Sequence, residues 1–333
     1  MPKKTFYILS NGTVLRRAGK RLILEKQGKK FYDCPLQDVG RILVYASTEI
    51  TGQTLSALME EQIPLYFVKR SGELKGKIMP ANNTQIQLRI LQHRSFFNDT
   101  FSLPLAKSFI YTKLQNMREI LIYLYQNGRG TQDVCQPIQN AAERLSQCQN
   151  REEIMGIEGA AARHYFQIIG SKLPEPFQFS QRSRRPALDP TNALLNLGYM
   201  TLLREIQAHV EAHHLDSYIG LLHAIQDGRA SLALDLMEEF RQPFIDLFVM
   251  KAINRGSIKP EHFIKKEDSL LITHEGMDRF FRLYEEKMGM QDGEEPGLRK
   301  LIDDQVHSLK KHLLGEDTYK NFQIEFGNQE NHG

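Results

Sequence analysis

The hydrophobic pattern of this chain changes once, near Gly76, and this change constrains the fold more than any other feature. Residues 4–70 contain short runs rich in Val, Ile, Tyr and Phe, separated by turn signals such as Asn11-Gly12. Beyond residue 82 the apolar residues recur every three or four positions, which indicates one helix after another. The sequence therefore predicts strands in its first part and helices in the rest.

A chain of 333 residues is long for one domain and suits two. We predict an α+β fold, in which a small, mostly antiparallel β-rich N-terminal domain with one helix, over residues 51–62, precedes a larger all-α domain. Hairpins are expected around Gly19 and across residues 265–269. The predicted boundaries are 1–76 for the β-rich domain, 77–95 for a linker and the first helix, 96–326 for the α-helical domain and 327–333 for a loose tail.

Charge is distributed unevenly along the chain. The formal net charge is only +3, which does not by itself require a polyanionic partner. Residues 1–30, however, hold nine Lys and Arg residues against one acid, Glu25. This basic region predicts a surface for an acidic partner, and a solubilising outer face of a sheet would explain it equally well.

Cysteine usage and hydropathy exclude several classes of protein. Cys34, Cys135 and Cys148 are odd in number and form no Cys-x-x-Cys pair, so neither a disulfide framework nor a zinc site is indicated. No signal peptide opens the chain, and no apolar run approaches the length of a membrane span. We expect a protein of the reducing cytoplasm without a membrane partner.

An amphipathic helix is predicted from Ser231 onward, because serine is a good N-cap residue. Its apolar stripe comprises Leu232, Leu236, Phe240, Phe244 and Leu247.

Polar residues of the same helix form a candidate metal site. Asp235 and Glu238 are three positions apart, so their carboxylates project from one face, and the preceding segment can return the imidazole of His223 to them. Two carboxylates and an imidazole can hold a divalent metal ion. The alternative is that these acids form the solvated face opposite the apolar stripe, and Glu239 is interpreted as a surface residue in either case.

A further acid, Glu158, lies at the edge of an apolar helical stripe in residues 151–172. A carboxylate there needs a partner, because burying an unpaired charge is costly. Gly156 and Gly159 leave little bulk beside it, so another backbone or a ligand can come close. The partner is either a shared cation or a donor such as Arg163, and a side chain directed to water is the remaining alternative.

Three arginines, Arg182, Arg184 and Arg185, lie in a polar loop, and Asp189 can cap the helix that follows. Guanidinium groups in loops suit phosphates, because each can form two parallel hydrogen bonds. Local acids could pair with these arginines instead and leave a solvated loop.

Two histidines on a predicted helix, His209 and His213, are four positions apart, a spacing seen in metal sites. The segment is not a His-Glu-x-x-His motif, however, because Glu211 falls in the wrong place. We therefore predict that these histidines, with His214, are surface or helix-end residues.

Three motifs in a fixed order give the chain a resemblance to a known family. They are GIEGAAARHYF around Glu158, SRRPALDPTNALLNLGYMTLL at residues 183–203 and IGLLHAIQDGRASLALDLMEEFRQP at residues 219–243. Over almost its whole length the sequence resembles the CRISPR-associated endonucleases that serve as the integrases of spacer acquisition. The resemblance implies that the helical domain is catalytic. It also implies that the enzyme inserts short foreign DNA fragments as spacers into a CRISPR array.

The resemblance further implies the site and its cofactor. The family holds one divalent metal with a Glu, a His and a final acidic residue, which match Glu158, His223 and Glu238. Asp235 matches a second acid on the same helix. Such ligands suit Mn²⁺ or Mg²⁺. The metal would polarise a phosphodiester during attack by a 3′-OH, in transesterification, or by water, in cleavage.

Partners also follow from the resemblance. It implies binding of double-stranded DNA, as spacer fragments and as the CRISPR repeat. It implies a homodimer formed through the β-rich domain, and a small second CRISPR adaptation protein that bridges two dimers. The residues expected to hold DNA phosphates are Arg182, Arg184, Arg185 and Arg163.

Two other functions stay open from the sequence. A non-catalytic nucleic-acid-binding scaffold would have one of Glu158, His223 and Glu238 missing or turned outward. A metal-dependent hydrolase of a small molecule would need a closed apolar pocket and fewer exposed arginines.

Overall fold

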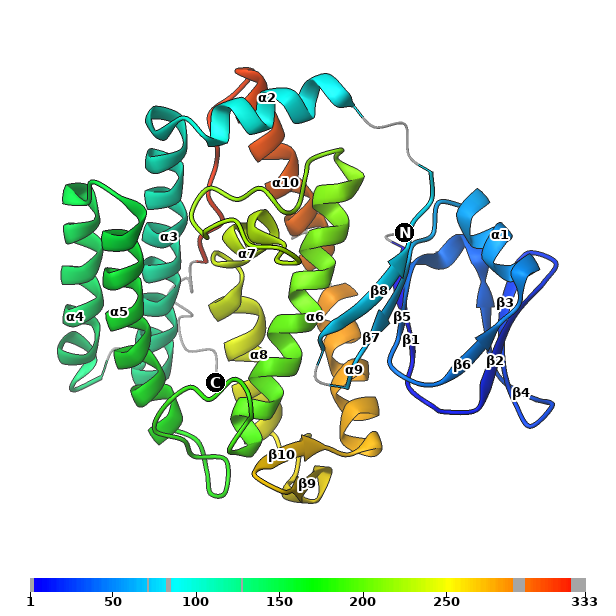
Figure 1. Ribbon diagram of the computed structural model, residues 1–333. Helices are drawn as coiled ribbons and strands as arrows, with labels where there is room; N and C mark the ends of the chain where they lie inside the picture. Colours follow the sequence, from blue (N-terminus) through cyan, green and yellow to red (C-terminus); the bar gives the residue numbers. More distant parts are fainter. Residues whose placement is uncertain (1–2, 71, 82–84, 127, 290–296, 325–333) are drawn as a thin grey trace, which may run out of the picture. The chain divides into compact units, whose positions relative to one another are not determined.

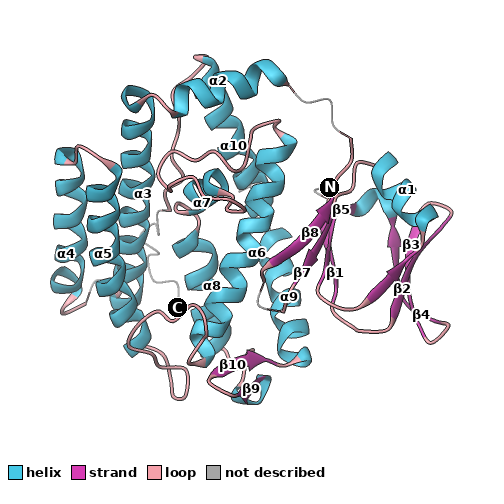
Figure 2. Ribbon diagram, viewed as in Figure 1, coloured by secondary structure: helices cyan, strands magenta, loops and turns pink. Residues whose placement is uncertain are grey.

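The computed structural model describes residues 3–70, 72–81, 85–126, 128–289 and 297–324. It confirms the predicted fold class, with a β-rich N-terminal region followed by helices (Figures 1 and 2). The predicted tail from residue 327 lies outside the described residues, as does Asn82-Asn83 of the linker. Contacts divide the chain into two compact units. The first comprises Met1–Thr84, Ile258–Ile264 and Ile272–Lys300, and the second comprises Gln85–Ser257, Lys265–Leu271 and Leu301–Gly333.

The first unit contains two four-stranded sheets, ordered β1-β5-β7-β8 and β4-β3-β2-β6. Its core draws on both sheets and on the helix α1, and includes Ile8, Leu15, Leu22, Ile42, Leu58 and Leu65. The bounds are β1 Lys4–Ile8, β2 Thr13–Ala18, β3 Arg21–Lys26, β4 Lys29–Pro35, β5 Val39–Val44, β6 Thr48–Ile50, α1 Gly52–Glu60, β7 Leu65–Val68 and β8 Leu74–Ile78. Later in the chain, α9 (His274–Gly289) packs against β1.

The strands pair in both directions, whereas the sequence indicated mostly antiparallel pairing. The ladder β2-β3-β4 is antiparallel, as is β7 with β8. The pairs β1–β5, β5–β7 and β2–β6 are parallel. The chain leaves the first sheet after β1, forms β2 to β4 in the other sheet and returns as β5, and such a crossover produces parallel neighbours. The predicted turns are confirmed, and Gly12 and Gly19 have the positive φ angles of +71° and +60° that glycine adopts readily.

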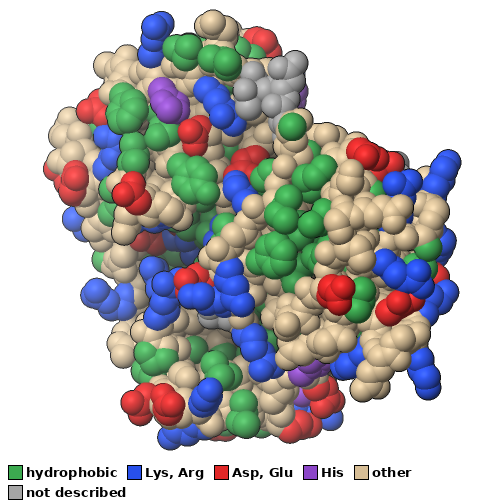
Figure 3. All heavy atoms as spheres, turned by 45° about the vertical axis from the view of Figure 1, so that its right-hand side comes forward, with side chains coloured by type: hydrophobic (Ala, Val, Ile, Leu, Met, Phe, Trp, Pro, Cys, Tyr) green, Lys and Arg blue, Asp and Glu red, His purple; other side chains and the backbone are tan. Residues whose placement is uncertain are grey.

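The basic residues of the N-terminal region are largely exposed on β2, β3 and β4, where Lys and Arg side chains gather at the right of Figure 3. Three of them pair with acids: Arg16 with Glu25 and Arg21 with Asp33 on a neighbouring strand, and Lys30 with Asp33 on the same strand. These pairs neutralise part of the charge, so both interpretations of the basic region stay open.

The second unit is helical. Within it, α3 packs against α4 and α5, and α6 packs against α7 (Figure 1). Asp189 caps α6 as predicted, because its Oδ1 accepts a hydrogen bond from the amide of Asn192 at 2.7 Å. The bounds are α2 Ile86–Phe96, α3 Asp99–Tyr125, α4 Thr131–Arg144, α5 Arg151–Ser171, α6 Pro190–Ala212, α7 Ser231–Met237, a π-helical turn Arg241–Asp246, α8 Leu247–Asn254 and α10 Leu298–Leu314.

The predicted late hairpin is confirmed as β9 (Phe263–Lys266) and β10 (Ser269–Ile272). Across the described ranges, no helix is both long and apolar enough to cross a membrane.

The histidines of α6 join that helix to α10. His209 Nδ1 lies 3.1 Å and His213 Nε2 lies 2.9 Å from the same oxygen, Asp303 Oδ1. His213 and His214 do follow the last helical residue, as predicted. The imidazoles of His209 and His213 are mostly covered, however, and serve a contact between helices that the sequence did not indicate.

We predict that Asp303→Asn weakens the fold in a pH-dependent way. The two imidazoles hold the pKa of Asp303 below its ordinary value of 3.8, so its contribution is present above that pH and declines as the pH falls below it. Because the side chain is 43% exposed, the loss near neutral pH should be about 1 kcal/mol or less. Urea unfolding of both proteins between about pH 3 and about pH 7 measures the difference. A difference in unfolding free energy between wild type and variant that is larger at about pH 3 than at about pH 7 would contradict this prediction.

Candidate active site

The helix α7 is buried on more than its apolar face. Its predicted stripe lies in the core, but Asp235, Glu238 and Glu239 are each at most 3% exposed as well. The solvated-face alternative is therefore wrong. The predicted Ser231 cap is also wrong, because Ala230 is the N-cap residue and the Ser231 hydroxyl donates to the carbonyl of Ala224 at 3.1 Å.

A proline changes the helix just beyond Glu238. Pro243 lies within the π-helical turn and has no N–H, so the carbonyl four residues earlier loses its helical partner. That carbonyl belongs to Glu239, and it accepts a hydrogen bond from Asn116 Nδ2 on α3 at 2.8 Å. Glu239 itself was expected at the surface, which is a further correction. Its side chain is fully buried, and burial raises its pKa to about 8.

The carboxylate of Asp235 organises the segment that carries His223. Its Oδ2 accepts hydrogen bonds from the amides of Leu221 (2.5 Å) and Leu222 (3.0 Å). Its Oδ1 accepts from the amide and from Nδ1 of His223, at 3.0 and 2.6 Å. A side chain on Gly220 would come within 2.7 Å of Asp235 Oδ2, so only glycine leaves room for this arrangement. Asp235 thus fixes both the position and the tautomer of the imidazole.

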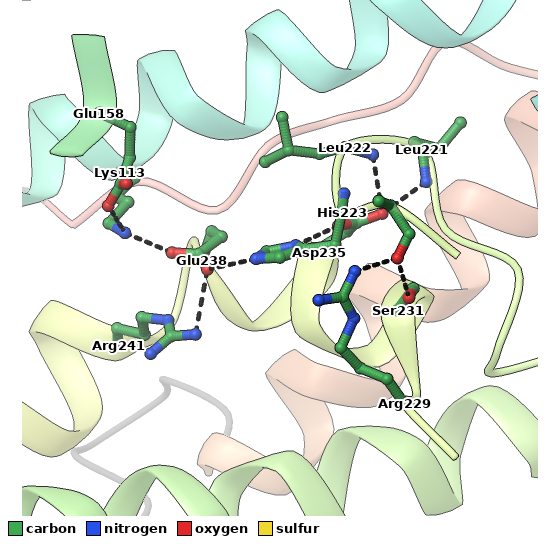
Figure 4. A network of polar contacts seen from close by, with 11 residues as sticks. Lys113, Glu158, Leu221, Leu222, His223, Arg229, Ser231, Asp235, Glu238 and Arg241 are labelled. Carbon is green, nitrogen blue, oxygen red and sulfur yellow. Dashed lines mark hydrogen bonds and ion pairs between the residues drawn. The ribbon is translucent and has the colours of Figure 1, made fainter. Parts of the chain in front are cut away.

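Glu238 lies at the centre of the resulting site (Figure 4). Its Oε2 accepts a hydrogen bond from Lys113 Nζ at 2.5 Å, and its Oε1 forms an ion pair with Arg241 Nη2 at 3.1 Å. His223 Nε2 lies 3.8 Å from the same Oε1. The ammonium of Lys113 also donates to Glu158 Oε1. These contacts therefore bring together α3, α5, the segment after α6 and the end of α7.

Buried charges compensate one another here. Burial alone would raise the pKa of Glu238, but Arg241, Lys113 and His223 lower it to about 2. Burial alone would likewise lower the pKa of Lys113, but Glu158 and Glu238 hold it above its ordinary value. Both groups are therefore ionised at neutral pH.

Lys113 and Arg241 are the site residues that sequence reasoning missed. Lys113 follows Ile110 by three positions and precedes Met117 by four, so it falls on a buried stripe of α3. A cation on such a stripe needs an anionic partner, and this was the available signal. Arg241 is three residues after Glu238, a spacing at which helical side chains meet.

Glu158 has the shared cation that the sequence allowed, and the cation is Lys113 rather than Arg163. The small residues beside it are not covered by another backbone. A Cβ atom added to Gly156 or Gly159 would meet nothing within 4 Å. This part of α5 therefore has open space at both glycines.

The predicted arginine loop divides into two parts. Arg182 is turned into the protein, where it donates to Asn192 and Asn196 and lies 5.4 Å from the centroid of the Tyr199 ring. Arg241 lies 4.9 Å from the same ring, so the loop is linked to the site through Tyr199. The remaining arginines of the DNA-binding prediction are exposed, namely Arg184, Arg185 and Arg163.

The donor set fits a divalent metal ion. Asp235 engages Nδ1 of His223, which leaves Nε2, directed toward Glu238, as the nitrogen able to bind a metal. The carboxylates of Glu158 and Glu238 already enclose a cation, the ammonium of Lys113. In the part of the chain that the structure describes, no three His, Cys, Asp or Glu side chains surround a common metal position as they stand.

Known proteins share this architecture. The family model described as CRISPR associated protein Cas1 matches residues 6–286. The CRISPR-associated endonuclease Cas1 3 of Thermus thermophilus is 31% identical over 308 residues, which cover 91% of this chain and 89% of the relative. The structure of a CAS1 protein from Thermotoga maritima has a TM-score of 0.83 at 26% identity, covering 96% of this chain and 100% of that one. A casposase bound to integration product has the same fold, with a TM-score of 0.84 at 22% identity over 99% of this chain and 96% of the other.

These likenesses place the chain among the endonucleases of CRISPR systems. It belongs to the Cas1 family of CRISPR-associated proteins, as the three sequence motifs predicted.

We predict that Lys113→Met makes the stability of the protein depend on divalent metal. Without the ammonium, two buried carboxylates lose a counter-ion, which should cost about 3–5 kcal/mol in metal-free buffer. A divalent cation should compensate for this loss, because it binds the folded state only. Thermal unfolding with and without Mn²⁺ measures the effect, and Lys107→Met on the same helix is the control. Equal stabilisation of variant and wild type by Mn²⁺ would refute this account.

Proposed function

We propose that this chain is a divalent-metal-dependent DNA endonuclease and strand transferase that inserts short foreign DNA fragments as spacers into a CRISPR array. The observation that carries the proposal is the position of Glu238, which shares the Lys113 ammonium with Glu158 and lies 3.8 Å from His223 Nε2. Membership of the Cas1 family supports the nuclease, and the shared fold of a casposase is compatible with integration.

Two observations favour this function over the alternatives. A non-catalytic scaffold would have turned one of the three ligands outward, but the side chains of Glu158, His223 and Glu238 are only 15%, 16% and 4% exposed. A hydrolase of small molecules would enclose its site in apolar residues. Here Lys113 and Arg241 lie beside the carboxylates, as suits a polyanionic substrate.

Each side chain receives a role in this proposal. Glu158, His223 through Nε2 and Glu238 would hold Mn²⁺ or Mg²⁺, which would polarise the phosphodiester and stabilise charge on its oxygens. Asp235 keeps the imidazole oriented and is not itself a ligand, since both of its oxygens accept hydrogen bonds from residues 221–223. Arg241 holds Glu238 from the other side.

The reaction joins a 3′ end of the fragment to an internal phosphodiester of the repeat. In strand transfer, the 3′-OH oxygen of the fragment would bond to a phosphorus of the repeat, and the P–O3′ bond of the repeat would break, with the proton passing to the departing 3′ oxygen. Water in place of the 3′-OH gives cleavage.

Partners and location complete the proposal. We propose a homodimer formed through the β-rich unit and a small second adaptation protein that bridges two dimers, on the basis of the family resemblance. A cytoplasmic location is supported by Cys34, Cys135 and Cys148, which are free thiols, as a reducing compartment maintains them.

Glu158→Gln should abolish both cleavage and strand transfer and leave DNA affinity within about twofold, because the amide keeps the shape of the side chain and removes a negative ligand. The activity should fall by at least about 100-fold. A strand-transfer assay on a plasmid with a CRISPR array, combined with a DNA-binding titration, measures both effects. The matched control is Glu152→Gln, an exposed residue of the same helix. Full strand transfer by Glu158→Gln in Mn²⁺ would exclude the metal-ligand role.

Replacement of Arg184 and Arg185 by Ala should weaken binding of all DNA sequences alike. Each lost phosphate contact should also reduce the slope of log affinity against log salt by about 1. Titrations of several duplexes at several salt concentrations test this, with Lys310 and Lys311 replaced by Ala as a charge-matched control. A loss confined to one sequence would contradict phosphate contact.

A further inference from the structure

A short segment near the C-terminus is bound directly behind the catalytic helix. We call residues 319–324 the C-terminal strap. Among the described residues, three of the four donors to the carboxyl group of Glu239 come from it. They are the hydroxyl of Tyr319 (3.2 Å), Nδ2 of Asn321 (2.5 Å) and the amide of Phe322 (3.0 Å). The fourth donor is Nε2 of Gln305 on α10, at 2.8 Å.

Asn116 ties the strap to α3 at the same point. Its Oδ1 accepts a hydrogen bond from the amide of Ile324 at 3.0 Å. Its Nδ2 donates to the carbonyls of Phe322 (3.2 Å) and Glu239 (2.8 Å). Asn116 is fully buried and lies one helical turn beyond Lys113. One amide side chain therefore connects the strap, the helix of Lys113 and the backbone next to Glu238.

Aromatic rings fix the strap to the same two elements. The ring of Phe322 lies 5.1 Å from that of Phe240 and 5.3 Å from that of Phe244, between ring centroids. The ring of Tyr319 packs edge-on against Phe109 of α3 at 5.1 Å. These contacts surround the point at which Pro243 interrupts helical hydrogen bonding, where the backbone has fewer bonds of its own.

We propose that the C-terminal strap is a positioning element of the active site, which holds Glu238 in register with Lys113 by binding Glu239 and Asn116. The inference rests on the proposed function. Lys113 is on α3 and Glu238 is at the end of α7, so the geometry of their contact depends on how these elements are held together. The strap makes hydrogen bonds or ring contacts to both. A displacement of about 1 Å at a reacting centre can reduce the rate about 100-fold, so a loose strap should impair catalysis without removing a catalytic group.

The test uses Phe322→Ala in the full-length chain, with Phe322→Leu as the conservative variant. Well below the unfolding temperature, Phe322→Ala should lower kcat for strand transfer about 10- to 100-fold and leave KM for DNA within about twofold. It should raise the Mn²⁺ concentration needed for half-maximal activity and speed hydrogen exchange of the amides of residues 237–246. Phe322→Leu should restore kcat to within about threefold, because it refills most of the space between the rings.

Phe101→Ala is the control for lost stability, because it removes an aromatic contact between α3 and α10 that does not involve the strap. If Phe322→Ala lowers the unfolding temperature no more than Phe101→Ala and kcat falls equally in both, the strap only stabilises the fold and the proposal is wrong. Unchanged exchange of residues 237–246 in Phe322→Ala would also overturn it. If wild-type protein has no strand-transfer activity but Phe322→Ala still speeds hydrogen exchange of residues 237–246, the proposed function is wrong. The inference that the strap holds the site in place would then still stand.

Discussion

The ammonium of Lys113, shared by the carboxylates of Glu158 and Glu238, is the interaction on which the rest of the site depends. Burial of two carboxylates in one place is unfavourable unless a cation lies between them. Lys113 supplies that cation and thereby joins α3 to α5 and to the end of α7. The position between the carboxylates therefore suits a cation, and in the function that we propose a divalent ion would compete with the lysine for it.

The surrounding groups are arranged around this charge cluster. Asp235, Glu158 and Glu238 contribute three negative charges, and Lys113 and Arg241 contribute two positive ones. Asp235 is separated from the others in function, because its oxygens are taken up by three backbone amides and one imidazole nitrogen. One acid therefore orients the histidine, and the other two face a cation. This arrangement is typical of metal sites in which neighbouring residues hold the ligands in place.

Sequence reasoning reached the parts of the structure that depend on local patterns. The change of period near Gly76 predicted the order of strands and helices, and the spacing of Asp235 and Glu238 placed two carboxylates on one face. The sequence did not predict features that depend on packing between residues distant in the chain. Glu239 is buried because the C-terminal strap and Asn116 form hydrogen bonds to it, and both are distant from Glu239 in the sequence. The parallel pairing of β1 with β5 depends in the same way on a crossover through another sheet.

The remaining failures have a common cause. A helix that is enclosed on all sides carries polar residues that resemble a solvated face, and only their partners distinguish the two. Lys113 supplied a signal, because a lysine within an apolar stripe needs an anion, but it did not say which one. The family resemblance predicted that Glu158 and Glu238 lie in one site. The structure shows the Lys113 ammonium between them, which the sequence did not predict.

Anomalous diffraction from a crystal of the protein soaked in Mn²⁺ tests the central claim most directly. The account predicts a single strong peak within about 2.0–2.4 Å of Glu158 and Glu238 oxygens and of His223 Nε2, with the Lys113 ammonium displaced from its position between the carboxylates. A peak bound to Asp235 instead, or Lys113 still in place with no peak between Glu158 and Glu238, would contradict it.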